Sequence, residues 1–78
     1  TDEAAAREEV RRRVRQAVAE LDARERVPIH LLYFEEYSLV EIARLEGVPE
    51  STIRSRVKAG LRRLEPRLGD LMPSAESL

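Results

Sequence analysis

The chain has 78 residues, with 14 Lys or Arg and 15 Asp or Glu side chains and a formal net charge of −1. It contains no cysteine, which excludes a disulfide framework and a thiolate metal site. The longest apolar stretch, "PIHLLYF", is far too short to span a membrane and no signal peptide is recognisable, so we expect a small, soluble, intracellular helical domain.

Positive charge is concentrated in one segment of the chain. Residues 50–67 hold six basic and two acidic side chains, whereas residues 1–49 carry a net charge of −3 and residues 68–78 a net charge of −2. A basic segment within a slightly acidic chain indicates a polyanionic partner, even when the net charge hides it.

The first helix is predicted from about residue 2 to residue 21. Apolar side chains recur at helical spacing along it, at Val10, Val14, Ala17, Val18 and Leu21. The dense "RRRVR" segment lies beside acidic residues, with Glu8–Arg12 and Glu9–Arg13 at i,i+4 spacing. We therefore interpret this segment as a solvated helix face rather than a nucleic-acid contact.

The second helix is predicted from about residue 23 to residue 36. Asp22 followed by Glu25 predicts a capping box at its start. The apolar run "HLLYF" also fits a short buried strand, but the helical context favours a helix buried on several sides. His30 has no acidic or cysteine partner nearby in the sequence, which favours a partly buried structural role.

Two further helices follow, separated by a tight turn. Ser38 and Glu41 predict a second capping box, at the start of a helix over residues 39–46. Gly47 suits a left-handed residue that ends this helix, and Pro49 suits the first position of the next. The fourth helix is predicted to run to about residue 64, or to residue 68 with a kink at Pro66. Residues 69–78 are expected to be a disordered tail.

Two short helices joined by a turn that contains glycine predict a helix-turn-helix. The fold class is accordingly all-α: a four-helix domain over residues 1–68 with a C-terminal helix-turn-helix and no wing. On the fourth helix, Ile53, Val57, Leu61, Leu64 and Leu68 mark the buried face. Ser55, Ala59 and Arg62 point outward, and small side chains there allow the helix to lie deep in a DNA major groove.

This arrangement gives a set of candidate DNA contacts. The residues nearest the start of the helix would meet base edges first, and the long cations would reach phosphates. The candidates are Glu50, Ser51, Thr52, Arg54, Ser55, Arg56, Lys58, Arg62 and Arg63. The alternative is a solvent-exposed amphipathic helix whose arginines extend into water.

Residues 14–68 resemble region 4, the C-terminal promoter-binding domain of bacterial RNA polymerase sigma factors, and most closely the extracytoplasmic-function type. The resemblance depends on Leu21, residues 24–34, "YS" at 37–38, "EIA" at 41–43, "GV" at 47–48 and above all "TIRSRV" at 52–57. "EIA" followed by "TIRSR" is fairly specific, whereas "EIA" alone occurs in many helix-turn-helix regulators.

The resemblance implies a function. The fourth helix would dock in the major groove of the −35 promoter element, with Ser51, Thr52, Arg54, Ser55 and Arg56 facing the groove and Lys58, Arg62 and Arg63 on the backbone. The first two helices, including Leu31 and Phe34, would bind the flap of the RNA polymerase β subunit, and an anti-sigma factor could cover the same surfaces. It further implies a monomeric cytoplasmic domain associated with the nucleoid, and a chain that is a fragment of a longer protein.

Several positions depart from the family pattern. Asp22 replaces a proline, Glu46 replaces an apolar residue, and Pro49 replaces a polar helix cap. Ala59 and Leu61 stand where arginine is common, so fewer phosphate contacts and a lower DNA affinity are expected.

Two other functions remain open on the sequence. A dimeric response-regulator output domain shares the four-helix shape, although Arg56 stands where that class usually has histidine. A sigma-like domain that binds only a protein partner is the other. An enzyme is not expected, because no phosphate loop, paired catalytic carboxylates, nucleophile–base pair or metal cluster is recognisable, and no cofactor is predicted.

Overall fold

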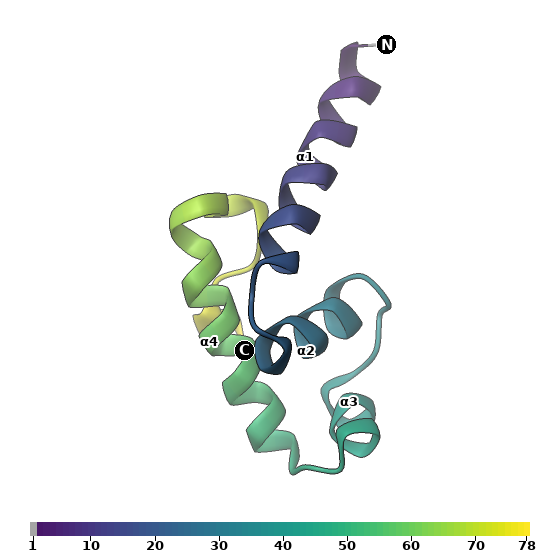
Figure 1. Cartoon of the computed structure of the whole chain (residues 1–78), viewed down its shortest axis with the longest axis vertical. Helices are drawn as coiled ribbons and strands as arrows, with labels where there is room; N and C mark the ends of the chain where they lie inside the picture. The colour runs from purple at the N-terminus through teal and green to yellow at the C-terminus, as the bar shows by residue number, and fades with distance from the viewer. Residues whose placement is uncertain (1) are drawn as a thin grey trace.

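Four α-helices and two short 3-10 helices make up the computed structural model, which describes residues 2–78 (Figure 1). They are α1 (Asp2–Ala19), α2 (Ala23–Tyr33), α3 (Leu39–Glu46), α4 (Glu50–Leu68), η1 (Gly69–Leu71) and η2 (Ala75–Ser77). Within these residues there is no strand, so the all-α prediction is confirmed and "HLLYF" is helical through Tyr33. None of the helices described is both long enough and apolar enough to cross a bilayer.

Helix α4 is the element against which the other helices pack. It contacts α1, α2 and α3, and both 3-10 helices lie against it. Ile29 of α2, Ile42 of α3 and Ile53 and Val57 of α4 are fully buried, and Leu64 continues the same core along α4. Because three helices share this core, the orientation of α4 is fixed by packing on one side only, and its opposite side is available for a partner.

The first half of α1 extends beyond the rest of the molecule (Figure 1), which measures 44 × 22 × 21 Å. Val10, expected in the buried stripe, is therefore 37% exposed, whereas Val14, Ala17 and Val18 are buried. Glu8 pairs with Arg11 and Glu9 with Arg12, both at i,i+3 spacing, rather than with Arg12 and Arg13 as expected; Glu3 pairs with Arg7 at i,i+4 spacing. The basic segment of α1 is thus partly neutralised by its own helix, as expected.

The start of α2 follows the prediction only in part. Helix α1 ends at Ala19, two residues earlier than expected, and Asp22 caps α2 by accepting a hydrogen bond from the Glu25 amide at 3.2 Å. The reciprocal half of the predicted capping box is absent, because the Glu25 carboxylate accepts from Arg63 of α4 instead.

Helix α2 ends three residues before its predicted end. Glu36 has a positive φ of 58°, and the Tyr37 amide donates to the Leu31 carbonyl at 2.9 Å, a helix-ending pattern that the absence of glycine concealed. The same turn brings Glu35 to within 3.4 Å of His30 Nε2. The prediction that His30 lacks an acidic neighbour was therefore wrong, although the imidazole is half-buried as expected and stacks edge-on against Phe34.

A close approach between α2 and α4 occurs at Gly60, to which the sequence analysis gave no role. A Cβ atom added there would lie 2.3 Å from Ile29 Cδ1 and 3.3 Å from Glu25 Cβ. Glycine at this position therefore sets the distance between the two helices.

Residues 69–78 differ from the disordered tail that was expected. The chain reverses at Gly69, which has a positive φ of 52°, and η2 then packs on α4 with Ala75 only 1% exposed. A buried alanine and half-buried Met72 and Leu78 supply the apolar contacts that the sequence pattern did not reveal.

Candidate nucleic-acid interface

Helices α3 and α4 form the predicted helix-turn-helix. Helix α3 begins with a complete capping box: the Glu41 amide donates to Ser38 Oγ at 3.1 Å, and the Ser38 amide donates to Glu41 Oε1 at 2.8 Å. These hydrogen bonds from Ser38 hold the pKa of the Glu41 carboxyl below its usual value. The predicted bounds of α3 and its predicted cap are confirmed.

In the turn between the two helices, Gly47 ends α3 as a left-handed residue, as predicted. This residue is left-handed, with φ 68° and ψ 34°, and the next amide, that of Val48, donates to the Ala43 carbonyl at 3.1 Å. Pro49 lies one position earlier than predicted: it is the cap residue, with Glu50 as the first residue of α4. No side chain caps α4, so no side-chain acceptor occupies its first amides, although the Thr52 amide donates to the Pro49 carbonyl at 3.0 Å.

The face of α4 opposite the core is accessible, as the groove hypothesis requires. Ser51, Ser55 and Arg62 are exposed, and Lys58 and Ala59 are half-buried beside them. The buried face of α4 consists of Ile53, Val57, Gly60, Leu61, Leu64 and Leu68. The five apolar residues predicted for this face are all present, and the outward residues do not enter the core.

One flank of α4 carries three arginines that each pair with a carboxylate from another part of the chain. Arg56 Nη1 lies 3.8 Å from Glu46 Oε1 of α3, and Arg67 Nη1 lies 2.9 Å from Oε1 of Glu20, the residue that follows α1. Between them, Arg63 Nε lies 3.0 Å from Oε1 and 3.1 Å from Oε2 of Glu25 in α2, and donates its hydrogen bond to Oε2. We call Arg56, Arg63 and Arg67 the acid-paired flank.

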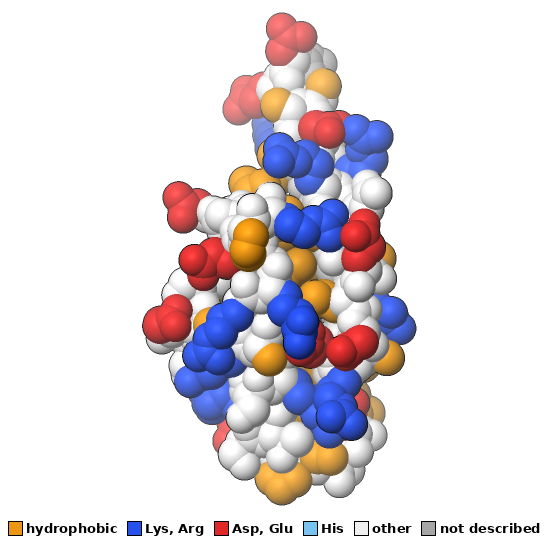
Figure 2. Space-filling model, turned by 60° about the vertical axis from the view of Figure 1, so that its left-hand side comes forward, with side chains coloured by type: hydrophobic (Ala, Val, Ile, Leu, Met, Phe, Trp, Pro, Cys, Tyr) orange, Lys and Arg blue, Asp and Glu red, His pale blue; other side chains and the backbone are white. Residues whose placement is uncertain are grey.

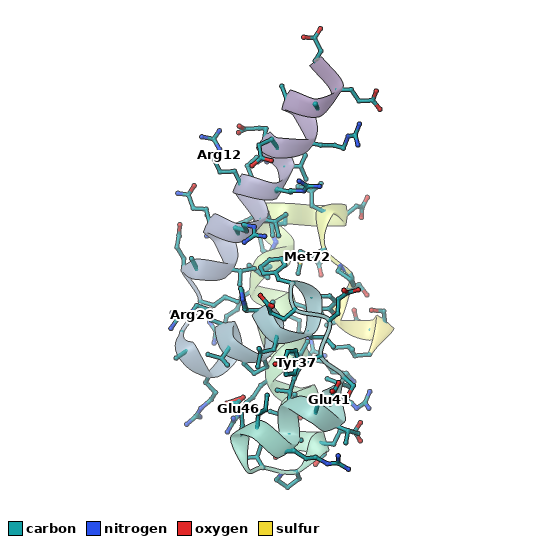
Figure 3. All side chains as sticks on the ribbon, turned by 90° about the vertical axis from the view of Figure 1, so that its right-hand side faces the viewer. Arg12, Arg26, Tyr37, Glu41, Glu46 and Met72 are labelled. Atoms are coloured by element: carbon teal, nitrogen blue, oxygen red, sulfur yellow. The ribbon has the colours of Figure 1, made fainter. Side chains whose placement is uncertain are left out.

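The acid-paired flank includes one buried and one half-buried carboxylate. Glu25 is 7% exposed, and its Oε1 atom has no hydrogen-bond partner. Glu46 is half-buried and also has one buried oxygen without a hydrogen bond. Because an unpaired buried charge is costly, these carboxylates hold Arg56 and Arg63 against the protein. Figure 3 places Glu46 at the end of α3 and Glu41 at its start.

The opposite flank of α4 carries Arg54 and Lys58. The Arg54 guanidinium lies 3.4 Å from Glu50 Oε1 through Nη2 and donates to the main-chain oxygen of Leu78 at 2.9 Å through Nη1. Lys58 and Arg62 have no ion pair in the described part of the chain. The side of the molecule that carries α4 accordingly shows basic side chains interleaved with acidic ones rather than one continuous basic patch (Figure 2).

The nine predicted contacts therefore lie on one helix but differ in exposure and in their partners within the chain. Five are solvent-exposed: Glu50, Ser51, Ser55, Arg62 and Arg63. Thr52 and Lys58 are half-buried, and Arg54, Arg56 and Arg63 are engaged by acceptors of the same chain. The spacing of seven and four residues along the acid-paired flank is visible in the sequence, but its partners lie on α2, on α3 and in the turn after α1.

An apolar groove of about 440 Å³ lies between α1, the end of α2 and η1. Its lining includes Val10, Tyr33, Phe34 and Met72, with Arg11 and Arg15 at the rim. The Arg15 guanidinium carbon lies 5.2 Å from the centre of the Phe34 ring, and burial raises the pKa of Tyr33. Of the two predicted partner contacts, Phe34 lines this groove, whereas Leu31 packs against the core and does not.

The described residues contain no group of histidine, cysteine and acidic side chains that could hold a metal ion.

The family model of sigma-70, region 4 matches residues 17–65 of the chain. No curated protein and no solved structure matches the chain. The matched residues begin in the second half of α1 and include α2, α3, the turn and α4 as far as Glu65.

Proposed function

Since this chain belongs to the sigma-70 region 4 family, whose members are non-enzymatic helix-turn-helix domains that bind the −35 promoter element, we propose that α4 enters the major groove of such an element. The observation that carries the proposal is the accessible face of α4. Ser51 and Ser55 are small enough for close approach, and Lys58 and Arg62 lie beside them without an ion pair to any of residues 2–78. The apolar side of the same helix is fixed in the core.

The candidate contacts have different roles in this proposal. Glu50, Ser51, Thr52 and Ser55 lie in the first turns and face base edges, while Lys58 and Arg62 bind phosphates. Arg54, Arg56 and Arg63 reach DNA only if they exchange a partner in the chain for a phosphate or a base. Arg63 has the most to lose, because its departure leaves the buried Glu25 carboxylate unpaired.

Binding to RNA polymerase is the second part of the proposal. The groove beside Phe34 offers an apolar floor and arginines at its rim, which suits an apolar segment such as the β flap. Leu31 contributes by supporting α2 from the core side rather than by direct contact. We further propose that the chain belongs to an extracytoplasmic-function factor, is monomeric, acts in the cytoplasm near the nucleoid and is controlled by an anti-sigma factor. These proposals follow from the resemblance of "TIRSRV" and its neighbours to that family.

The test is selection of bound sequences from random duplex DNA with core polymerase present, followed by titration of the isolated domain by fluorescence anisotropy. We expect weak binding that falls steeply with salt, with a log–log slope of about 0.9 for each phosphate contact. Lys58→Ala and Arg62→Ala should each reduce that slope by about one unit. Arg54→Ala should weaken binding and, if Arg54 contacts a base, flatten the preference for the selected sequence.

Arg13→Ala provides the matched control, since it removes an exposed arginine of α1 for which no ion pair is found. It should leave the slope nearly unchanged. Absence of binding at low salt to any selected duplex, or equal losses for Arg13→Ala and Arg62→Ala, would contradict the proposed orientation of α4.

A further inference from the structure

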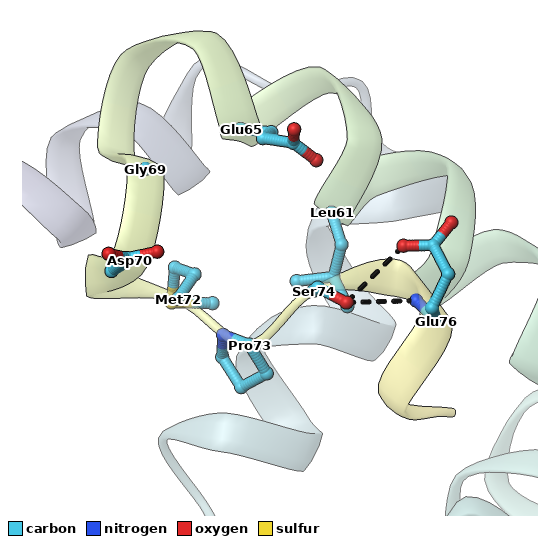
Figure 4. Close-up of a pocket in the computed structure, with 8 residues that line it drawn as sticks. All are labelled: Leu61, Glu65, Gly69, Asp70, Met72, Pro73, Ser74 and Glu76. Atoms are coloured by element: carbon cyan, nitrogen blue, oxygen red, sulfur yellow. Dashed lines mark hydrogen bonds between the residues drawn. The ribbon is translucent and has the colours of Figure 1, made fainter.

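The C-terminal segment, residues 69–78, runs back along α4 instead of leaving the domain (Figure 4). After the reversal at Gly69, Ala75 inserts its methyl group into the core, at 1% exposure, and Leu78 is half-buried. Ser74 holds η2 in shape: its hydroxyl accepts from the Glu76 amide at 3.2 Å, and its carbonyl accepts from Ser77 Oγ at 2.7 Å. The segment therefore has a defined conformation and a defined place.

That place is the flank of α4 that carries Arg54. The segment passes Leu61 and Glu65, and the main-chain oxygen of Leu78 accepts from Arg54 Nη1 at 2.9 Å. Glu50 lies at the other terminal nitrogen of the same guanidinium, at 3.4 Å. Arg54 is the arginine of this flank that lies close to the start of α4. Both of its terminal nitrogens thus contact acceptors of the same chain.

The segment also changes the charge of this flank. It contains Asp70 and Glu76 and no basic residue, and it lies against a helix whose residues 50–67 carry a net charge of +4. Glu65, Asp70 and Glu76 surround a hollow of about 490 Å³ between the segment and α4. A DNA backbone approaching this flank would meet carboxylates in place of arginine. The hollow separates part of the segment from α4, whereas Ala75 and Leu78 contact the core.

We propose that the C-terminal segment is an autoinhibitory element that competes with DNA for Arg54. The inference rests on the proposed function of α4. When the segment is bound, only the fraction of molecules with the segment released can use Arg54, and the apparent dissociation constant rises in inverse proportion to that fraction. A segment bound in nine molecules of ten weakens binding about tenfold.

Ala75→Glu in the full chain tests the proposal, because a carboxylate cannot be accommodated in the buried site of the Ala75 methyl. Leu71→Glu is the matched control: it adds the same charge to the segment at an exposed position and leaves both Ala75 and the hydrogen bonds of Ser74 in place. Binding of a selected −35 duplex is measured by fluorescence anisotropy at low salt. Order in residues 75–78 is followed by ¹⁵N relaxation, which reports release without DNA.

We expect Ala75→Glu to mobilise the segment and to tighten DNA binding by about three- to tenfold relative to Leu71→Glu. If the segment is mobile in one variant and ordered in the other but both bind DNA with equal affinity, the proposed autoinhibition is overturned. DNA binding by α4 would stand in that case. Absence of binding in both variants and in the unmodified chain would overturn the proposed function together with the inference.

Ala75→Ser provides a milder displacement if Ala75→Glu lowers the helix content measured by circular dichroism. It adds one buried hydroxyl, and a smaller gain in affinity with partial mobility is expected. A folded variant with a mobile segment and no gain in affinity would overturn the proposal.

Discussion

Replacement of Gly60 by alanine tests the packing of α4 against α2 directly. In an exposed helix interior this change stabilises the helix by about 1 kcal/mol. Here the new Cβ would lie 2.3 Å from Ile29 Cδ1, which is about 1.2 Å inside the shortest ordinary carbon–carbon contact. Ile29 is fully buried and cannot move into solvent, and overpacking of this kind costs about 1–3 kcal/mol. We therefore expect a net loss of about 1 kcal/mol, or roughly 4–8 °C in Tm for a domain of this size.

The assay is urea unfolding followed by circular dichroism on four proteins: the unmodified chain, Gly60→Ala, Ile29→Val and the double variant. Ile29→Val removes the Cδ1 atom that the new methyl would meet and should cost about 0.5–1.5 kcal/mol alone. The double variant should be more stable than the sum of the single changes predicts, because the clash has been removed. A Gly60→Ala variant as stable as the unmodified chain, or strict additivity in the cycle, would refute the argument.

Two further changes test the ion pairs and the cap of the helix-turn-helix. Arg63→Ala should lower the free energy of unfolding by about 1 kcal/mol, because it leaves the buried Glu25 carboxylate without its partner. Arg62 has no ion pair within residues 2–78, so Arg62→Ala should change the free energy of unfolding by less than about 0.5 kcal/mol. Equal effects of the two substitutions in urea unfolding would count against the acid-paired flank. Ser38→Ala should cost about 1 kcal/mol through loss of the cap of α3. Glu41 has a lowered pKa when folded, so its stabilising contribution is complete above its ordinary value of 4.5 and is lost as the pH falls through the lowered pKa. Glu41→Gln should therefore reduce Tm at neutral pH, and this reduction should shrink as the pH is lowered below 4.5; a loss of Tm that does not change with pH would contradict this.

The parts of the fold that depend on local chemistry could be predicted from the sequence. The bounds of α3, its capping box and the left-handed Gly47 each follow from residues within a few positions of one another. The buried face of α4 follows from its period. The same local reasoning missed the end of α2, because Glu36 adopts a positive φ that is ordinarily left to glycine or asparagine.

Contacts between distant residues could not be predicted in the same way. Glu25 had the spacing of a capping residue, but the fold brings it to Arg63, 38 positions later, where a charged partner is available. Gly60 looked like an ordinary helical residue until the position of Ile29 was known. The apolar residues of the C-terminal segment show no helical or strand period, and its order depends on Ala75, Met72 and Leu78 reaching sites formed by the folded domain.

The central claim is that the outward face of α4 is the surface that binds DNA. Mapping of amide chemical shifts in ¹⁵N-labelled protein, on addition of a selected −35 duplex and of a scrambled duplex, tests it most directly. The account predicts shifts at Ser51, Thr52, Ser55 and Lys58 that are larger with the selected duplex. Shifts confined to Arg11, Arg12 and Arg13 of α1, or the same pattern with both duplexes, would contradict it.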